Sequence, residues 1–435
     1  MKKRIAYLLS ALLVISSVAG CGSTGESTDS TKQSTASEVS VSTAAASTTP
    51  VAKLAGKITF YTNMSNNVDT TLKELAKSFM DANPGTEIVN ESVAGDAFAQ
   101  KLDIAMATNS LADITAVSGP KVSKTTFADY FLPIDDLGFT KDNLLFYNDG
   151  VGTDGKLYKM TAAVTYWAMI YNKKVFADCG ITSVPRTLEE LYAACEKIKA
   201  KNIIPITTNY KDGWPLTAPS QFNTVALKGG DYFNSLVSGD ELITADGLGA
   251  QFKLWADLRD KGYLDKDLMS ASWDQCQRDI AQGKAAMTCI GSFAPKMFAD
   301  QGANIQDIGM FPWVGAPGAY SGSDWYYAIA KNTKNPELAK AYFKYMWEEG
   351  RYANAIGSVS PVLGVKSTIP AVDELLSYGT PVQASENSDD LNAILGKAQV
   401  SIATALQEYL GSKTPEEIVK TYNKKWADAK KALGK

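Results

Sequence analysis

The side chains that could carry chemistry in this chain are aromatic rings, carboxylates and hydroxyls. Its 435 residues include no histidine. Because histidine is the commonest general base and the commonest metal ligand, Ser-His-Asp, Cys-His and histidine–metal sites are all excluded. The sequence also contains no P-loop and no GxGxxG motif. We therefore expect no catalytic residue, no metal site and no cofactor.

Adjacent acidic residues provide the material for one alternative, a secreted glycoside hydrolase or polysaccharide lyase. Such an enzyme needs two carboxylates about 5–10 Å apart across a cleft. The adjacent pairs are Asp135–Asp136, Glu189–Glu190 and Asp240–Glu241. Neighbours in sequence usually point apart or lie on a solvated helix face, so these pairs give the catalytic alternative little support.

The cysteines suggest neither a zinc site nor a redox motif, since none of them shows CxxC spacing. Four lie beyond residue 21, at positions 179, 195, 276 and 289. In an exported protein Cys179 could pair with Cys195, or Cys276 with Cys289, and the sequence does not choose. Cys195 lies on the apolar face of a predicted helix, which favours a buried free thiol.

The tryptophans divide into those expected to pack and those that could contact a ligand. Trp255, Trp347 and Trp426 fall in helical patterns, so we expect them to be packing or surface residues. Trp214 follows a strand end in the turn-rich stretch YKDGWPL, and Trp273 precedes a predicted helix. These two rings are candidates for a binding surface.

Further candidates lie on strands and at their ends. Tyr166 and Trp167 are adjacent on a predicted strand, so one should face a cleft and the other the core. Phe293 follows the strand AAMTCIG. Trp325 lies in the stretch SGSDWYY, with Asp324 beside it as a hydrogen-bonding partner for a ligand.

Polar candidates follow the first and third predicted strands. They are Asn63 and Ser65 in the first loop and Ser118 after the third strand. In open α/β sheets, ligands bind at the carboxyl ends of strands. The same residue types also serve as ordinary turn residues, so their role stays open.

The elements that must position these side chains alternate between strands and helices. Residues 57–61 form a predicted strand, and TEIVNESV and ADITAV are the next two. Between them, apolar residues recur at helical spacing, as in Leu72, Leu75 and Phe79. This β-α-β-α-β order predicts a largely parallel sheet covered on both faces.

A second α/β block begins with the long apolar strand AAVTYWAMIYN. Thr187 and Glu190 form a predicted capping box for a helix over 188–201, followed by the strand IIPITTN. Thr414 and Glu417 predict a second capping box, at the start of the C-terminal helix. Further helices are predicted near 248–261, 275–282 and 336–347. A body of about 380 residues is too long for one core and suits two domains.

The N-terminal segment has the features of a secretory signal. Three basic residues precede the apolar stretch 5–18, which is too short for a comfortable membrane span of about 20 residues. The cleavage region ends at Cys21, where a bacterial lipoprotein carries its lipid-modified residue, so the segment resembles a lipobox. Residues 22–50 contain eight Ser and seven Thr. This composition predicts a disordered tether.

The order of the segments resembles the extracellular solute-binding proteins of carbohydrate ABC importers, the group that includes maltose-binding protein. The likeness spans about residues 57–426. The segments that carry it are KITFYTN, LAKSFMDANPGTEI, DGKLYKMTAAVTYWAMIYNKKVFADCGI, VPRTLEELYAACEKIKAKNIIPI, IAQGKAAMTCIGSF and SDWYYAIAKNTKNPELAKAYFKYMWEE.

The resemblance implies an α/β, two-lobed periplasmic-binding-protein-like (type II) fold with a hinge of three crossings between the lobes. The implied organisation is a lipoprotein signal peptide at 1–20, a tether at 21–54, lobe 1 at 55–162 plus 327–363, and lobe 2 at 163–326 plus 364–435. In this alignment Trp214 matches a position beside the ligand, and Phe293 stands where the family has a cleft tryptophan. Val117 and Val400 stand where some sugar binders place aromatic platforms, which argues against a maltodextrin-type ligand.

The resemblance implies capture of a sugar or oligosaccharide and its delivery to the permease subunits of an ABC transporter. A sugar has apolar C–H faces and hydroxyl edges, which suit aromatic rings and paired polar groups. We expect a non-enzymatic monomer, lipid-anchored through Cys21 at the extracellular face of the membrane of a Gram-positive cell, or on the periplasmic side if the cell is Gram-negative. The mildly acidic net charge of −4 argues against a nucleic-acid partner. The second alternative is a surface carbohydrate adhesin without transport.

Overall fold

The computed structural model describes residues 54–65, 67–93, 96–117, 122–412 and 414–435. The described residues all belong to one compact unit. The predicted signal peptide, the lipid-attachment residue Cys21, Ser118 and all but the last residue of the predicted tether lie outside the described residues. Within those residues, no helix is both long and apolar enough to cross a membrane.

The first of two sheets has the strand order β2-β1-β3-β10-β4. Its parallel part, β2-β1-β3, is the predicted β-α-β-α-β unit, while β10 runs antiparallel to both β3 and β4. The bounds are β1 (Gly56–Thr62), α1 (Thr71–Ala82), β2 (Thr86–Ser92), α2 (Asp96–Ala107), β3 (Ile114–Val117), α3 (Phe127–Tyr130), β4 (Lys159–Thr161) and β10 (Tyr326–Ile329). We call the part of the chain built around this sheet lobe 1.

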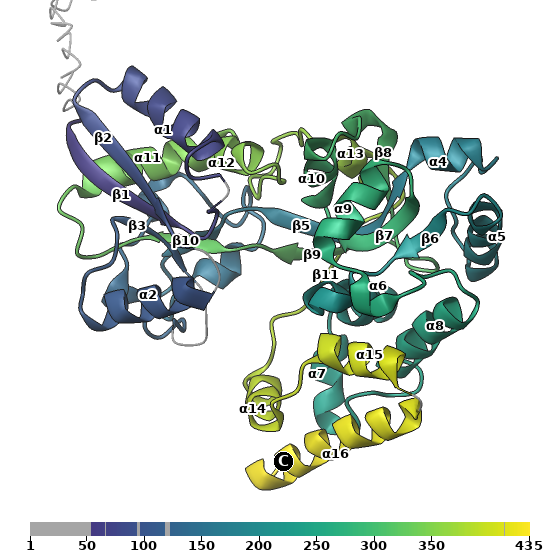
Figure 1. The fold of residues 1–435 in the computed structure, drawn as a ribbon. Coiled ribbons are helices and arrows are strands. Elements are labelled where there is room, and N and C mark those ends of the chain that lie inside the picture. Colours follow the sequence, from purple (N-terminus) through teal and green to yellow (C-terminus); the bar gives the residue numbers. More distant parts are fainter. Residues whose placement is uncertain (1–53, 66, 94–95, 118–121, 413) are drawn as a thin grey trace, which may run out of the picture. The chain divides into compact units, whose positions relative to one another are not determined.

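Alternate residues of β1 face different helices, as a strand requires. The Phe60 ring stacks on Tyr327 and meets Tyr342 of α11 (Pro336–Glu348) edge to face. Its neighbour Tyr61 stacks instead on Phe98 of α2. Lobe 1 therefore has α1, α11 and α12 (Arg351–Ala355) on one side of the sheet and α2 on the other (Figure 1).

The second sheet has the strand order β11-β9-β5-β7-β6, with β8 also paired to β5. We call the part built around it lobe 2. Successive residues of β5 point into different cores, because Met169 packs with one buried cluster and Ile170 with another. The strands are β5 (Val164–Asn172), β6 (Ile204–Thr207), β7 (Ala285–Gly291), β8 (Ile308–Phe311), β9 (Tyr320–Ser323) and β11 (Val382–Gln383).

Helices cover both faces of the second sheet (Figure 1). Thr187 and Glu190 form the predicted capping box. The second predicted box is wrong: the Thr414 hydroxyl donates to the Glu417 carboxylate at 3.0 Å and makes no cap to a backbone N–H. The helices are α4 (Lys173–Asp178), α5 (Leu188–Lys199), α6 (Asn223–Lys228), α7 (Tyr232–Ser235), α8 (Leu248–Asp260), α9 (Trp273–Ala281), α10 (Ala294–Asp300), α13 (Pro370–Ser377), α14 (Asp389–Ala398), α15 (Ile402–Gly411) and α16 (Pro415–Leu433).

The two sheets are joined by crossing segments that lie side by side. The first runs from β4 to β5 and the second from β9 to β10. They are tied together because the Ala162 N–H donates to the Trp325 carbonyl at 2.6 Å and the Asp324 N–H to the Ala163 carbonyl at 3.0 Å. The Val164 N–H also donates to Val359, at 2.8 Å. The predicted two-lobed α/β fold is confirmed, whereas the lobe boundaries stay a prediction.

All four cysteines beyond residue 21 are buried free thiols. Neither of the two disulfides left open by the sequence is formed, and the favoured reading of Cys195 is confirmed. Burial raises the pKa of the Cys195, Cys276 and Cys289 thiols to about 12. Because the thiolate is the reactive form, these side chains behave as small apolar groups.

Candidate functional site

Five aromatic rings of lobe 2 form one contiguous group, which we call the aromatic surface: Trp167, Trp214, Phe222, Trp273 and Phe293. The Phe293 ring lies at the centre, with centroid distances of 5.8 Å to Trp167, 6.4 Å to Trp214 and 6.2 Å to Trp273. Trp214 and Trp273 also meet edge to face at 5.9 Å. The four predicted rings Trp167, Trp214, Trp273 and Phe293 are thus brought together.

The β5 strand decides which of its two adjacent aromatic residues joins this group. Tyr166 is 7% exposed and belongs to the apolar cluster around α9, α10 and α13. Trp167 faces the other way, is half-buried and contacts Phe222 at 4.7 Å. The alternation of side chains along a strand therefore places Trp167, and not Tyr166, on the aromatic surface.

Phe293 owes its position to the glycine that ends β7. A Cβ atom on Gly291 would lie 2.4 Å from the Phe293 ring and 2.7 Å from the Thr165 methyl group. Any larger residue would have to displace one of these side chains. Gly291 therefore permits the close approach of the Phe293 ring to β5 and β7.

Trp214 is the most exposed ring of the group, at 45%. The loop that carries it is fastened at two points. Tyr210 exchanges two hydrogen bonds with Gln407 of α15, at 2.9 and 2.6 Å. Asp212 accepts a hydrogen bond from the backbone N–H of Trp273 at 2.5 Å. This exposed indole is therefore presented by a fixed loop, and Asp212 couples the two segments that carry Trp214 and Trp273.

Lobe 1 contributes a smaller and more polar group of candidate side chains beside the crossing segments. The Asn63 Oδ1 accepts a hydrogen bond from Tyr327 at 3.2 Å, and the Trp325 ring meets Phe98 edge to face at 5.0 Å. The Asp324 carboxylate accepts only the neighbouring N–H of Trp325 among the described residues, at 2.8 Å. Burial raises its pKa above the usual range.

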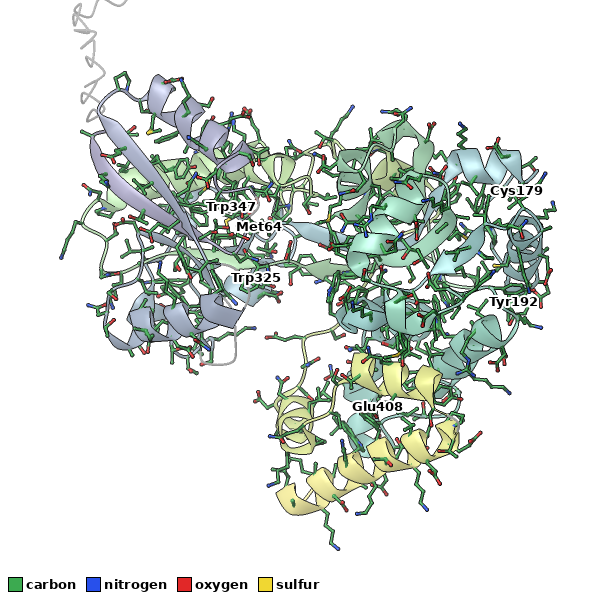
Figure 2. The ribbon with its side chains drawn as sticks, in the orientation of Figure 1. Met64, Cys179, Tyr192, Trp325, Trp347 and Glu408 are labelled. Atoms are coloured by element: carbon green, nitrogen blue, oxygen red, sulfur yellow. The ribbon has the colours of Figure 1, made fainter. Side chains whose placement is uncertain are left out.

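Among these predicted lobe 1 residues, Asn63 is held by Tyr327, whose hydroxyl donates to the Asn63 side chain. Ser65 lies two residues beyond Asn63, and its N–H donates to the Asn63 carbonyl at 3.0 Å. Trp325 is a half-buried residue of the crossing and is labelled in Figure 2. Ser118 cannot be placed, because it lies outside the described residues.

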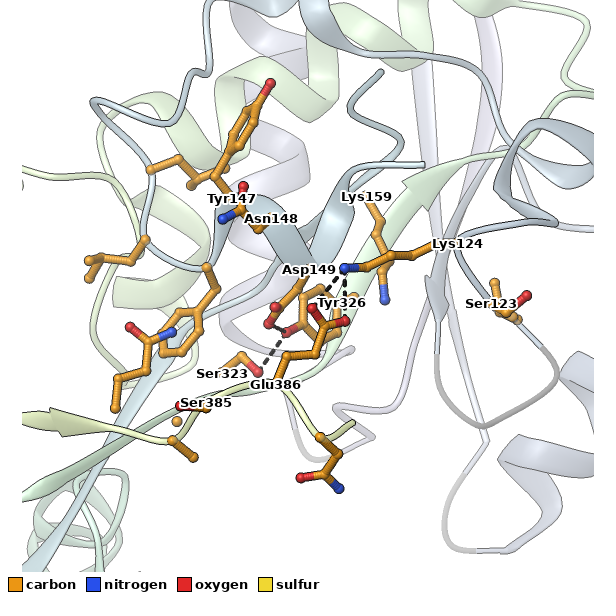
Figure 3. Close-up of a pocket in the computed structure, with 18 of the residues that line it drawn as sticks. Ser123, Lys124, Tyr147, Asn148, Asp149, Lys159, Ser323, Tyr326, Ser385 and Glu386 are labelled. Carbon is orange, nitrogen blue, oxygen red and sulfur yellow. Dashed lines mark hydrogen bonds and ion pairs between the residues drawn. The ribbon is translucent and has the colours of Figure 1, made fainter. Parts of the chain in front are cut away.

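A pocket of about 1240 Å³ opens beside the crossing segments (Figure 3). Its walls come from both lobes. Lobe 1 supplies the segment after β3, the turn at 147–150 and β4, while lobe 2 supplies β9 and the segment that leads from β11 to α14. Tyr320 of β9 lines this pocket and stacks on Phe222 at 4.2 Å, so the pocket adjoins the aromatic surface.

Groups of both charges line this pocket. Lys124 and Glu386 form an ion pair of 2.8 Å that joins the two lobes. Asp149 accepts a hydrogen bond from the Tyr326 hydroxyl, which also contacts Ser323 (Figure 3). Lys159 lies with its ammonium 4.0 Å from the centre of the Tyr326 ring, and its burial lowers the pKa to about 8.

Comparison with known proteins shows to which family this chain belongs. The sequence profile of the family described as bacterial extracellular solute-binding protein matches residues 65–350. The chain belongs to this family. The predicted membership of the solute-binding proteins of carbohydrate ABC importers is thereby confirmed, as is the two-lobed fold, whereas the lipoprotein part of the prediction stays a prediction.

Individual relatives of this solute-binding protein have low sequence identity to it, but the matches cover most of each chain. The multiple sugar-binding protein of Streptococcus mutans is 25% identical over 328 residues, covering 70% of this chain and 75% of that one. The diacetylchitobiose binding protein of Streptomyces coelicolor is 24% identical over 391 residues, covering 85% and 83%.

Solved structures share the fold. A manno-oligosaccharide specific solute-binding protein from Bifidobacterium animalis subsp. lactis, in complex with mannotriose, has a TM-score of 0.72 at 20% identity. The match covers 87% of this chain and 95% of that one. Neither alternative, an enzyme or an adhesin, finds support among these relatives.

The acidic pairs considered for catalysis have structural partners in this solute-binding protein. Asp136 pairs with Lys340 at 2.7 Å, and Glu190 caps α5. Asp240 contacts Lys430 at 3.5 Å. No cluster of three or more metal-binding side chains occurs among the described residues.

Sequence reasoning missed much of the pocket and part of the aromatic surface. Phe222 and Tyr320 were not singled out, nor were Lys124, Asp149 or Lys159. Tyr320 carried a usable signal, since it follows a glycine-rich stretch and begins the crossing that leads to Trp325. The three charged residues carried none, because single charged residues are common on any surface.

Proposed function

We propose that this solute-binding protein captures a sugar or oligosaccharide between its two lobes and delivers it to the permease subunits of an ABC transporter. The aromatic surface carries the proposal, because it offers Trp214, Phe293 and Trp167 as flat apolar faces and adjoins the pocket lined by both lobes. Pyranose rings stack on such faces through their C–H bonds, while their hydroxyl groups need polar partners.

Lobe 1 offers those polar partners. Asn63, Ser65 and Asp324 provide acceptor oxygens and donors, and Trp325 provides one further ring. In the proposed mechanism the solute first stacks on lobe 2, and lobe 1 then closes over it by bending at the crossing segments. No bond is made or broken in the ligand.

Relatives support the same ligand class. The names of the Streptococcus mutans and Streptomyces coelicolor proteins refer to sugars, and the Bifidobacterium structure contains mannotriose. We extend this class to the present chain because its aromatic surface provides the stacking faces that such ligands require.

We also propose that the mature chain is a monomer held at the extracellular face of the cell membrane by lipid on Cys21. The lipobox-like sequence before Cys21 supports this, since two or more acyl chains hold a protein stably. Substitution of Cys21 by Ser should release the protein into the medium. If the variant stays with the membrane fraction, the proposed anchor is wrong.

Calorimetry of the purified full-length protein with a panel of neutral mono-, di- and trisaccharides tests the ligand class. We expect micromolar or tighter binding of at least one member, and no release of reducing sugar. Trp214→Ala should weaken that binding by about tenfold to a hundredfold, since stacking on one aromatic ring contributes roughly 1–3 kcal/mol. Leu376→Ala, which truncates an apolar side chain of similar exposure (40%) on α13, is the matched control.

A failure of every saccharide to bind would exclude carbohydrate capture. Release of reducing sugar from a polysaccharide would favour the enzyme alternative instead.

A further inference from the structure

We propose that the pocket beside the crossing segments recognises an uncharged, polyhydroxylated end unit of the ligand, with Lys159 and Asp149 as its specificity-determining residues. This inference rests on the proposed carbohydrate function and goes beyond it, because it assigns a second binding region and excludes charged sugars. Of the site residues predicted from the sequence, only those on the adjoining aromatic surface take part in the proposed recognition.

Lys159 is an ammonium group without a polar protein partner. Within the described part of the chain, its Nζ makes no hydrogen bond and no ion pair; it is held over the rings of Tyr326 at 4.0 Å and Phe127 at 4.9 Å. Cation–π contacts orient the side chain but leave its N–H donors unused. Since Lys159 lines the pocket, a ligand oxygen could accept those hydrogen bonds.

Asp149 provides the complementary acceptor. One of its oxygens, Oδ2, accepts the Tyr326 hydroxyl proton, and no hydrogen bond to Oδ1 is found among the described residues. Tyr326 lies against both groups, since its ring supports the Lys159 ammonium and its hydroxyl contacts Asp149. A sugar hydroxyl both donates and accepts, so neighbouring hydroxyls match an ammonium and a carboxylate that contact the same tyrosine.

The balance of charge argues for an uncharged ligand. The pocket is lined by three lysines and three acidic residues, namely Lys124, Lys141, Lys159, Asp149, Glu386 and Asp389. A ligand carboxylate would find no excess of positive charge here and would lie near Asp149 and Glu386. Transfer of a charge from water without such compensation is unfavourable, whereas hydroxyls lose little when they are hydrogen-bonded.

The pocket adjoins the aromatic surface through one ring contact. Tyr320 lines the pocket and stacks on Phe222 at 4.2 Å, and Phe222 contacts Trp167 at 4.7 Å. The volume of about 1240 Å³ exceeds the range of roughly 300–1,000 Å³ that is common for sites of small organic ligands. One ligand chain can therefore place its end unit in the pocket and stack its other units on the rings.

The test compares matched neutral and acidic oligosaccharides, such as a neutral trisaccharide and the trisaccharide in which its end unit is the corresponding uronate. Calorimetry on the full-length protein should show the neutral ligand binding at least tenfold more tightly. Lys159→Met keeps the aliphatic stem over the two rings and should weaken binding of the neutral ligand about tenfold. Asp149→Asn should weaken it too and should narrow the gap between the neutral and the acidic ligand.

Lys425→Met is the matched control, because the Lys425 ammonium also lies over an aromatic ring, Tyr422 at 4.8 Å, but on α16. It should leave the affinity unchanged. Equal binding of the uronate by the wild-type protein, or full affinity in a folded Lys159→Met protein, would overturn the inference while carbohydrate capture stands. Absence of binding by both ligand series would overturn both.

Discussion

The aromatic surface and the charged pocket adjoin each other, yet they are built in different ways. On the aromatic surface, rings from β5, the helical turns at 214–222, the start of α9 and the N-cap of α10 touch one another, so each ring limits where its neighbours can lie. In the pocket, charged side chains from both lobes meet, and one of them, Lys159, lies over two rings and makes no hydrogen bond or ion pair with the described residues. The comparison suggests that the aromatic surface is rigid before a ligand arrives, whereas the pocket is completed by the ligand and by the approach of the lobes.

Gly291→Ala should have the largest effect, and it acts on the aromatic surface alone. The new Cβ would lie 2.4 Å from the Phe293 ring and 2.7 Å from the Thr165 methyl group, so the Phe293 ring must shift relative to its neighbours Trp167 and Trp214. Overpacking of this kind typically costs about 1–3 kcal/mol of stability. We expect a lower melting temperature together with a loss of sugar affinity of tenfold or more, measured by calorimetry.

Gly396→Ala is the matched control, because no atom lies within 4 Å of a Cβ at this position of α14. It should retain full affinity and gain slight stability, since alanine favours a helix more than glycine does. Unchanged affinity in Gly291→Ala would mean that Phe293 is no part of the binding surface.

The sequence predicted the aromatic surface better than the pocket for a physical reason. A tryptophan in a turn-rich loop, such as Trp214, is unusual enough to be noticed by itself, and strand alternation limits Tyr166 and Trp167 to two outcomes. Lys159 and Glu386 acquire meaning only through partners more than a hundred residues away, such as Tyr326 or Lys124. Local patterns cannot reveal such pairs.

Prediction of the fold was limited in the same way, because local patterns do not reveal contacts between distant segments. Alternating apolar patterns predicted β1, α1, β2, α2 and β3 and their parallel pairing, because each depends on its own segment. The family resemblance implied that residues 327–363 return to lobe 1, but the antiparallel insertion of β10 between β3 and β4 was not predicted, because it depends on the return of the chain from lobe 2. At Thr414 even a local motif failed, because Glu417 accepts the hydroxyl proton of Thr414 directly.

The pH dependence of binding should distinguish the pocket from the aromatic surface. Burial lowers the pKa of Lys159 to about 8, and the charged groups that act on it are Asp149, Lys124 and Glu386. If the ammonium donates to the ligand, affinity should be full near pH 7 and fall about tenfold by pH 9. Isothermal titration calorimetry at several pH values, with the wild type and with Lys159→Met, measures how the sugar affinity changes with pH.

The effect of Lys159 on stability has the opposite sign. A lysine pKa that is lower in the folded state means that the unfolded chain binds more protons between about pH 8 and 10.4, so the stability contributed by this group rises with pH in that range. If the affinity of the wild type falls with pH while its stability stays steady or rises, the loss of affinity comes from the binding site and not from unfolding. If the affinity of Lys159→Met falls in the same way, the titrating group is not Lys159.

Asp212→Ala should have a moderate effect, through the position of two rings rather than through contact with the ligand. Asp212 accepts the N–H of Trp273 and precedes Trp214 by two residues, so its loss should loosen the edge-to-face pair of indoles at 5.9 Å. We expect a several-fold loss of affinity and a weaker circular dichroism signal from the coupled indoles. Asp267→Ala, which removes a similar cap at the start of a nearby helical turn, should alter neither reading.

Asp212→Asn sharpens this result. An amide oxygen can still accept the Trp273 N–H, so the circular dichroism signal and the affinity should largely return. If alanine and asparagine give the same loss, Asp212 acts through its charge and not by holding Trp273.

Disruption of the ion pair between Lys124 and Glu386 should have the smallest effect. Their side chains are 37% and 62% exposed, and ion pairs at such exposure contribute about 0–1 kcal/mol and weaken with salt. Because this pair joins the two lobes, its loss should shift the balance between open and closed forms. Glu386→Gln should therefore change sugar affinity less than fivefold. It should also reduce the dependence of that affinity on salt. The charge-reversed double variant Lys124→Glu with Glu386→Lys should restore that dependence. If both variants show the salt response of the wild type, the pocket is closed by the ligand alone, and the contrast with the rigid aromatic surface becomes stronger.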